Sequence, residues 1–182
     1  MELNIEYIFI LCVLYINDIG DDLMNNHMEI PWHEYTNKDS KVKIENASLT
    51  EKSSIIGRIG LMLLACGTGA WRVRSSMNTI ASELNITCIA DIGLTNISYT
   101  CIDGIDSHAQ SLSLHNTSVN TSKLARMEDF VYHFKDECKT CTCNEIHNQL
   151  DQIESIHSSY SPVILGLAAA LACSCFTFLL GG

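Results

Sequence analysis

The sequence predicts an α+β fold: a helix, a small antiparallel sheet and further helices, followed by a C-terminal transmembrane helix. Three observations support this class. Apolar residues recur at helical spacing on both sides of a stretch in which they alternate with polar residues. Capping-box sequences precede two of the helical stretches. After the last of these, a segment as long as a bilayer core carries no charged residue.

Composition is typical of a folded protein. A chain of 182 residues can form one domain with a sizeable core and leave a terminal segment over, and 47% hydrophobic with 18% charged residues is unlike a disordered tail. A formal net charge of -10 and the lack of a basic stripe argue against nucleic acid as a partner. The nine cysteines are scattered, mostly in apolar segments, which favours a reducing compartment over a disulfide framework.

Three segments are expected along the chain. Residues 1–47 contain a short apolar stretch, Ile8 to Ile16, and then a polar linker that we leave unassigned. Because acidic rather than basic residues precede the apolar stretch, we do not expect a signal peptide. Residues 48–160 are expected to form the soluble α+β domain, and residues 161–182 the transmembrane helix.

The soluble domain should open with a helix. Ser48-Leu49-Thr50-Glu51 matches a capping box, and apolar residues follow in steps of three and four, which places them on one helix face. One long helix or two closely joined helices fit this pattern. Each helical glycine destabilises a helix by about 1 kcal/mol relative to alanine, so the glycines indicate close packing, with a kink near Gly67 as the alternative. The apolar positions are Ile59, Met62, Cys66, Ala70, Val73, Met77, Ile80 and Leu84, and the glycines are Gly57, Gly60, Gly67 and Gly69.

A change from helical spacing to alternation after Asn85 predicts strands. A third strand is expected from Gln110 to His115, after the turn-forming pair Asp103-Gly104. The three strands should form a small antiparallel sheet. The alternating apolar residues are Ile86, Cys88, Ala90 and Ile92, then Ile97, Tyr99 and Cys101, then Leu112 and Leu114.

Helical spacing resumes after the sheet and predicts two more helices. The second of them follows another capping box, Thr142-Cys143-Asn144-Glu145. Each presents one apolar face. The apolar positions are Leu124, Met127, Val131 and Phe134 in the first helix, and Ile146, Leu150 and Ile153 in the second.

The segment from Val163 to Leu180 is the transmembrane candidate. It has no charged residue, and at the helical rise it extends about 27 Å, close to a hydrocarbon core of about 30 Å. Ser161 and Pro162 suit the start of a helix. A buried core helix is the alternative. No Lys or Arg follows Lys139, so basic residues do not predict its orientation.

No motif predicts an enzyme or a cofactor. The most metal-like group is Cys138-x-x-Cys141-x-Cys143 with His147, but a second paired set of ligands is missing, and we favour a structural role. We therefore predict no catalytic, cofactor-binding or metal-binding residue. Arg72 and Arg74, which flank Val73 beside Trp71, fit either a solvated face with stacking on the indole or a contact with a carboxylate.

Several short motifs occur in one order along residues 48–182. They are Gly60-Leu61-Met62-Leu63-Leu64-Ala65-Cys66-Gly67, then Arg72-Val73, then Val119-Asn120-Thr121-Ser122-Lys123-Leu124, and finally Tyr160 before the membrane segment. In this the chain resembles the threonine/serine exporter family (ThrE, YjjP-type proteins). The family-motif residues, structural or transport-related, are Gly60, Gly67, Arg72, Val73, Asn120, Lys123 and Tyr160.

The resemblance implies a cytoplasmic soluble domain ahead of a membrane domain of several helices in the cell membrane. Such proteins export small hydrophilic metabolites such as threonine, serine or dicarboxylates, and some need a separate small membrane partner. The chain departs from the pattern at two points. Arg74 stands where an acidic residue usually follows the Arg-Val pair, and only one span is present.

Two functions are compared. The first is a subunit or truncated part of an exporter, not transport-competent alone because one helix cannot enclose a polar route. It would pair with other membrane helices, a small partner subunit or further copies of itself. The alternative is a membrane-anchored soluble domain with hydrolase-like or ligand-binding activity, for which the candidate residues are Arg72, Asp91, His108 and Lys123.

Overall fold

The computed structural model describes residues 30–36, 41–114, 120–156 and 162–179. The chain divides into two units. One is Ile30–Ser158, and the other joins Met1–Glu29 with Ser159–Gly182. The predicted α+β class with a three-stranded antiparallel sheet is confirmed.

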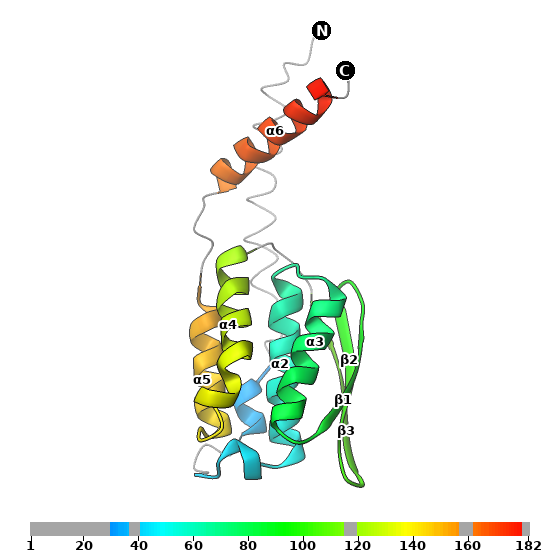
Figure 1. Ribbon diagram of the computed structural model, residues 1–182, viewed down its shortest axis with the longest axis vertical. Helices are drawn as coiled ribbons and strands as arrows, with labels where there is room; N and C mark the ends of the chain where they lie inside the picture. Colours follow the sequence, from blue (N-terminus) through cyan, green and yellow to red (C-terminus); the bar gives the residue numbers. More distant parts are fainter. Residues whose placement is uncertain (1–29, 37–40, 115–119, 157–161, 180–182) are drawn as a thin grey trace. The chain divides into compact units, whose positions relative to one another are not determined.

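Three layers build the unit Ile30–Ser158 (Figure 1). The sheet is one outer layer, and the pair α4 (Thr121–Glu137) and α5 (Cys143–Glu154) is the other. Between them lie α2 (Leu49–Ala65) and α3 (Ala70–Glu83). Because α2 packs against both outer layers, every residue from Lys52 to Leu64 is buried.

A glycine turn separates α2 from α3. Both bonds of the predicted capping box are present at the start of α2, between Ser48 and Glu51. At its end, the Gly67 amide donates to the Leu64 carbonyl, and Gly67 has φ 77°, a left-handed conformation that a side chain disfavours. Of the two arrangements that the sequence left open, the structure therefore has two helices, with the break at Gly67.

The glycines inside α2 permit close contacts, as predicted. A β-carbon on Gly57 would overlap the hydroxyl of Tyr99, which comes from the sheet. A β-carbon on Gly60 would lie 2.6 Å from the sulfur of Met77 on α3. The two glycines let the sheet and α3 approach the α2 backbone. The Tyr99 hydroxyl uses this closeness to donate to the Ser53 carbonyl at 3.0 Å.

The sheet has the order β1-β2-β3. Its strands are β1 (Thr87–Ile92), β2 (Asn96–Asp103) and β3 (Asp106–Ser113). Gly104, with φ 61°, forms the predicted turn between β2 and β3. β3 begins four residues before the predicted Gln110 and ends before His115, because the tight turn extends the pairing into a polar stretch without alternating apolar residues.

Two short segments ahead of the predicted boundary at residue 48 belong to the same unit. They form 3-10 helices at Trp32–Tyr35 and Ile44–Asn46. Trp32 is 8% exposed and Ile44 is fully buried. The Ile44 amide donates to the Cys141 carbonyl at 2.9 Å. The unit begins at Ile30 because these two apolar side chains, isolated in a polar stretch, enter the core.

In the second unit, the predicted C-terminal helix is present as α6, Pro162–Leu179. Four of its large apolar side chains are 54% to 77% exposed: Ile164, Leu167, Leu171 and Leu179. Over the residues that the structure describes, no helix combines the length and the apolar character needed to cross a membrane. The helix is confirmed, and its passage through a bilayer stays a prediction.

Candidate functional site

One end of the unit Ile30–Ser158 carries most of the family-motif residues. The end of α2, the first turn of α3 and the first turn of α4 contribute them (Figure 1). We call residues 66–74 and 120–126 the motif end. Its family-motif residues are Gly67, Arg72, Val73, Asn120 and Lys123.

Contacts between helices show that these residues are brought together. The Arg72 Nη1 atom donates to Glu128 Oε1 on α4 at 2.9 Å. Burial raises the pKa of the Cys66 thiol, and the nearby charge of Lys123 partly offsets that rise. Val73 is fully buried. The motif residues therefore join α2, α3 and α4 by packing, by an ion pair and by a nearby positive charge.

Asn120 fixes the point at which the chain leaves this unit. Its Oδ1 accepts a hydrogen bond from the Lys123 amide at 2.9 Å and so caps α4. Its Nδ2 donates to the carbonyl of Ile156 at 3.3 Å, just after α5 ends at Glu154. One asparagine side chain thus joins the start of α4 to the end of α5. Aspartate could make only the first of these bonds.

The two arginines of the motif end bind different groups. Arg72 combines both of the roles considered for it, since its guanidinium lies 5.5 Å from the ring centre of Trp71 and also pairs with Glu128. Arg74 donates from Nε to the Ala90 carbonyl on β1 at 3.1 Å. Arg74, which the resemblance marks as a departure from the family pattern, therefore bonds through Nε to backbone rather than to a carboxylate.

The remaining candidate residues lie elsewhere. Gly60 faces Met77 in the interior of α2, and Tyr160 lies outside the described residues. Asp91 is exposed on one face of the sheet, whereas His108 pairs in register with Cys101, whose side chain is buried on the other face. The four polar residues of the alternative function therefore do not form a single site.

A buried arginine and its charged partners were not predicted from the sequence. Arg58, in the middle of α2, is 2% exposed. Its Nη2 donates to the carboxylates of Asp151 and Glu154 on α5, the latter at 2.6 Å, and its Nη1 donates to the carbonyl of His147 at 3.1 Å. The two carboxylates offset the unfavourable burial of the guanidinium. Burial by itself would raise the pKa of Asp151, but Arg58 and neighbouring groups lower it overall.

The segment Trp32–Tyr35 covers this group, which we call the Arg58 network. His33 Nε2 lies 2.9 Å from Asp151 Oδ2, and its Nδ1 lies 3.1 Å from Asn144 Oδ1. The rings of Trp32 and His147 stack with centroids 6.3 Å apart. These contacts join the start of the unit to α5.

Ser54 and His147 resemble a nucleophile and its base, but their hydrogen bonds exclude that role. Ser54 Oγ lies 3.1 Å from His147 Nε2, and both residues are fully buried. Arg58 donates to Nδ1 of the same ring at 3.3 Å, which leaves the proton on Nε2. Nε2 therefore donates to Ser54 and cannot take its proton. Burial lowers the pKa of His147 to about 3, which keeps the ring neutral.

A sequence signal for the Arg58 network does exist. Arg58 is the only charged residue between Lys52 and Arg72. On α5, His147, Asp151 and Glu154 follow at intervals of four and three, which places them on one helix face. A lone cation in an apolar helix and a polar stripe on another helix are what an ion pair between two helices requires, but they do not identify the two helices as neighbours.

The cysteines of the most metal-like sequence group bond to other groups than His147. Burial raises the pKa of Cys138 and of Cys143 to about 12, so both thiols stay protonated near neutral pH. The Cys143 thiol donates to the Glu51 carbonyl, whereas His147 faces Arg58 and Ser54. Among the residues with described positions, no group of three or more His, Cys, Asp or Glu could hold a metal ion.

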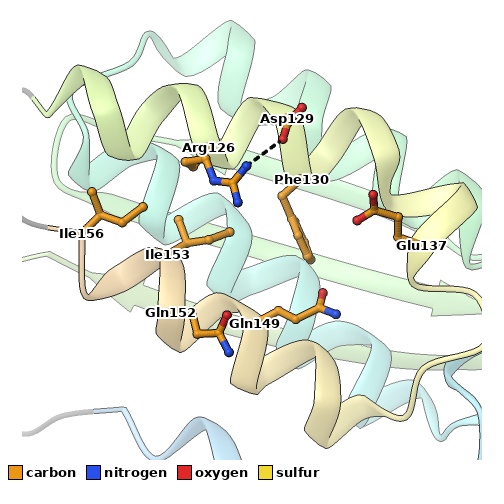
Figure 2. Close-up of a pocket in the computed structure, with 8 residues that line it drawn as sticks. All are labelled: Arg126, Asp129, Phe130, Glu137, Gln149, Gln152, Ile153 and Ile156. Atoms are coloured by element: carbon orange, nitrogen blue, oxygen red, sulfur yellow. Dashed lines mark hydrogen bonds and ion pairs between the residues drawn. The ribbon is translucent and has the colours of Figure 1, made fainter.

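A cavity of about 260 Å³ lies between α4 and α5. Figure 2 shows Phe130 pointing from α4 toward α5 within it. The Arg126–Asp129 ion pair at 3.2 Å is also part of the lining, with side chains 67% and 51% exposed. Water competes strongly with such exposed charges, so this cavity offers a small ligand only weak anchors.

Comparison with known families adds to this geometry. Residues 54–182 match the family described as "Putative threonine/serine exporter" (ThrE). No curated protein and no solved structure matches the chain. The matched range runs from the first turns of α2 through α6 and includes the motif end and Arg58, but not the segment Trp32–Tyr35.

Proposed function

Because the chain belongs to the threonine/serine exporter family, we propose that it is one component of a membrane exporter of small hydrophilic metabolites. Threonine, serine and dicarboxylates are the substrate classes considered. The observation that carries this proposal is the family match, which covers residues 54–182 of a chain of 182. An exporter, unlike a hydrolase, needs no nucleophile and base in this part of the chain.

The proposal assigns different tasks to the two units. The unit Ile30–Ser158 is a cytoplasmic domain, and α6 with the residues that follow it enters the membrane. The uncharged sequence from Val163 to Leu180 supports the entry of α6 into the membrane. This assignment goes beyond the described residues, among which no helix meets both requirements of a span. A single helix cannot enclose a polar route, so the route needs further helices besides α6.

The motif end connects these tasks. Asn120 holds the exit of α5, and α6 begins at Pro162. Asn120 therefore links the start of α4 to the segment that leads from α5 toward α6. We propose that the motif residues position the membrane segment, and that they do not bind the substrate.

Export is tested in the organism that produces the protein, where its natural partners are present. Deleting the gene should slow the release of labelled threonine or serine from preloaded cells, and the intact gene should restore release. A copy with Leu167→Lys and Leu171→Lys should not restore it, because each lysine opposes insertion by about 3 kcal/mol. Ile105→Lys, at a fully exposed turn position, is the matched control and should restore release. Unchanged release after deletion would refute the proposal.

A further inference from the structure

We infer that the motif end lies on the surface of an anionic lipid bilayer, with Trp71 at the membrane–water interface and Arg72, Arg74 and Lys123 facing lipid phosphates. The inference deepens the proposed function and rests on it, since it needs the chain to be at a membrane. It adds a lipid-binding surface on the cytoplasmic domain, separate from the membrane segment.

Trp71 is the first observation. Its side chain is 70% exposed in the first turn of α3, whereas the other tryptophan of the chain, Trp32, is 8% exposed. An indole so exposed loses the apolar contacts that usually hold tryptophan in a core. Tryptophan is enriched at the level of lipid headgroups, where its apolar ring and its N–H group are both accommodated.

Charge segregation is the second observation. The chain has 21 acidic and 11 basic residues. The segments 61–82 and 107–127, which contain the motif end, nevertheless have no acidic residue and four basic ones. Glu128 and Asp129 follow directly and pair with Arg72 and Arg126, so Arg74 and Lys123 leave this end of an otherwise acidic protein with a net positive charge that attracts phosphate groups. The four basic residues are Arg72, Arg74, Lys123 and Arg126.

The arginine contacts leave this surface available. Arg72 and its partner Glu128 are each 45% exposed at the side chain, and such a pair contributes little stability in water. Lipid phosphate can therefore replace Glu128 at small energetic loss. Arg74 is held beside β1 by its Nε bond to Ala90, which orders the guanidinium without neutralising it.

Chain connectivity is the third observation. Only residues 155–161 separate α5 from α6. Fully extended, seven residues reach about 25 Å. Because Asn120 holds Ile156 at the motif end, a membrane-embedded α6 would keep this end within that distance of the bilayer. The end that is basic and carries Trp71 is thus also the end closest in chain length to the membrane segment.

The test uses the full chain reconstituted into vesicles, with a Trp32→Phe substitution so that Trp71 is the only indole. In vesicles of anionic lipid with brominated acyl chains, we expect bromine to quench Trp71 and aqueous iodide to quench it weakly. Quenching by bromine should fall in zwitterionic vesicles and at high salt. The reciprocal variant Trp71→Phe reports from buried Trp32, which brominated lipid should not quench.

Charge variants test whether lipid binding depends on the arginines of the motif end or on the overall charge of the protein. The double variant Arg72→Gln with Arg74→Gln should lose the dependence of bromine quenching on anionic lipid. Lys135→Gln with Lys139→Gln removes the same charge at the far end of α4 and just beyond it, and should leave quenching unchanged. Strong iodide quenching of Trp71 in anionic vesicles would place it in water and overturn the inference. Protection from both quenchers would mean that protein covers it, which also overturns the inference.

The inference and the proposed function fail in different ways. If carbonate removes the chain from the vesicles, α6 is not embedded and that part of the proposed function fails, whatever Trp71 reports. If the chain resists carbonate while bromine leaves Trp71 unquenched, the lipid surface is refuted and the exporter proposal stands.

Discussion

Arg58 and Arg72 make similar contacts in very different surroundings. Each donates to a carboxylate on a neighbouring helix at less than 3 Å. The Arg58 side chain is only 3% exposed, whereas that of Arg72 is 45% exposed. The comparison shows that the burial of an ion pair, rather than its bond length, indicates what the pair does. The Arg58 network is part of the core, and the motif end is a surface.

The largest expected effect comes from removing the carboxylates of the Arg58 network. Asp151→Asn with Glu154→Gln leaves a buried guanidinium without a counter-charge, which should lower the free energy of unfolding by about 3 kcal/mol. Arg58→Met should cost less, because the two carboxylates, 47% and 54% exposed, can be hydrated. Urea unfolding followed by Trp32 fluorescence measures both. A loss below about 1 kcal/mol for the double variant would show that the network contributes little.

Acid should weaken the same network through His147. Its pKa is about 3 in the folded chain and near 6.5 when unfolded, so only the unfolded chain takes up this proton between those values. The stability that the neutral ring contributes is complete above about pH 6.5 and falls by about 1.4 kcal/mol per pH unit below it. Unfolding free energies of the wild type and His147→Gln between pH 7 and pH 5 test this. Equal slopes for the two proteins would contradict it.

A smaller effect is expected at the motif end from Asn120. Asn120→Ala removes the cap of α4 and should lower stability by about 1 kcal/mol. Asn120→Asp keeps the capping oxygen but loses the donor to Ile156, so it should unfold much like wild type. If Asn120 positions the exit, Asn120→Asp should still reduce threonine release in the deletion strain. Normal threonine release from the Asn120→Asp variant would show that Asn120 only caps α4.

The smallest effect should follow removal of the exposed ion pair. Arg72→Gln is expected to change the free energy of unfolding by less than about 1 kcal/mol, because water and salt already weaken the pair with Glu128. Urea unfolding at low and at high salt measures it. A loss as large as that of the Asp151→Asn with Glu154→Gln variant would remove the distinction between the two arginines.

Local features of the fold were predictable because they depend on neighbours in the sequence. Both capping boxes and the turn at Gly104 form as expected, since each is made within a few residues. The entry of Trp32 and Ile44 into the core was not predicted. The segment Trp32–Tyr35 contacts α2 and α5, and Ile44 bonds to Cys141, so their burial depends on contacts with parts of the chain that are distant in the sequence.

The candidate site, like the fold, was predictable only in part. The resemblance selected Gly67, Arg72 and Asn120, and contacts between helices place them at one end. The Arg58 network was not predicted because its partners lie about 90 residues apart in the sequence. Periodicity within one helix gives no information on which face of another helix it will meet.

Carbonate extraction decides whether the chain is embedded in a membrane. Membranes from cells expressing the full chain are washed at alkaline pH beside the Leu167→Lys with Leu171→Lys variant and the Ile105→Lys control. We expect the wild type and Ile105→Lys to remain in the pellet and the double variant to be released. Release of the wild type would contradict this expectation.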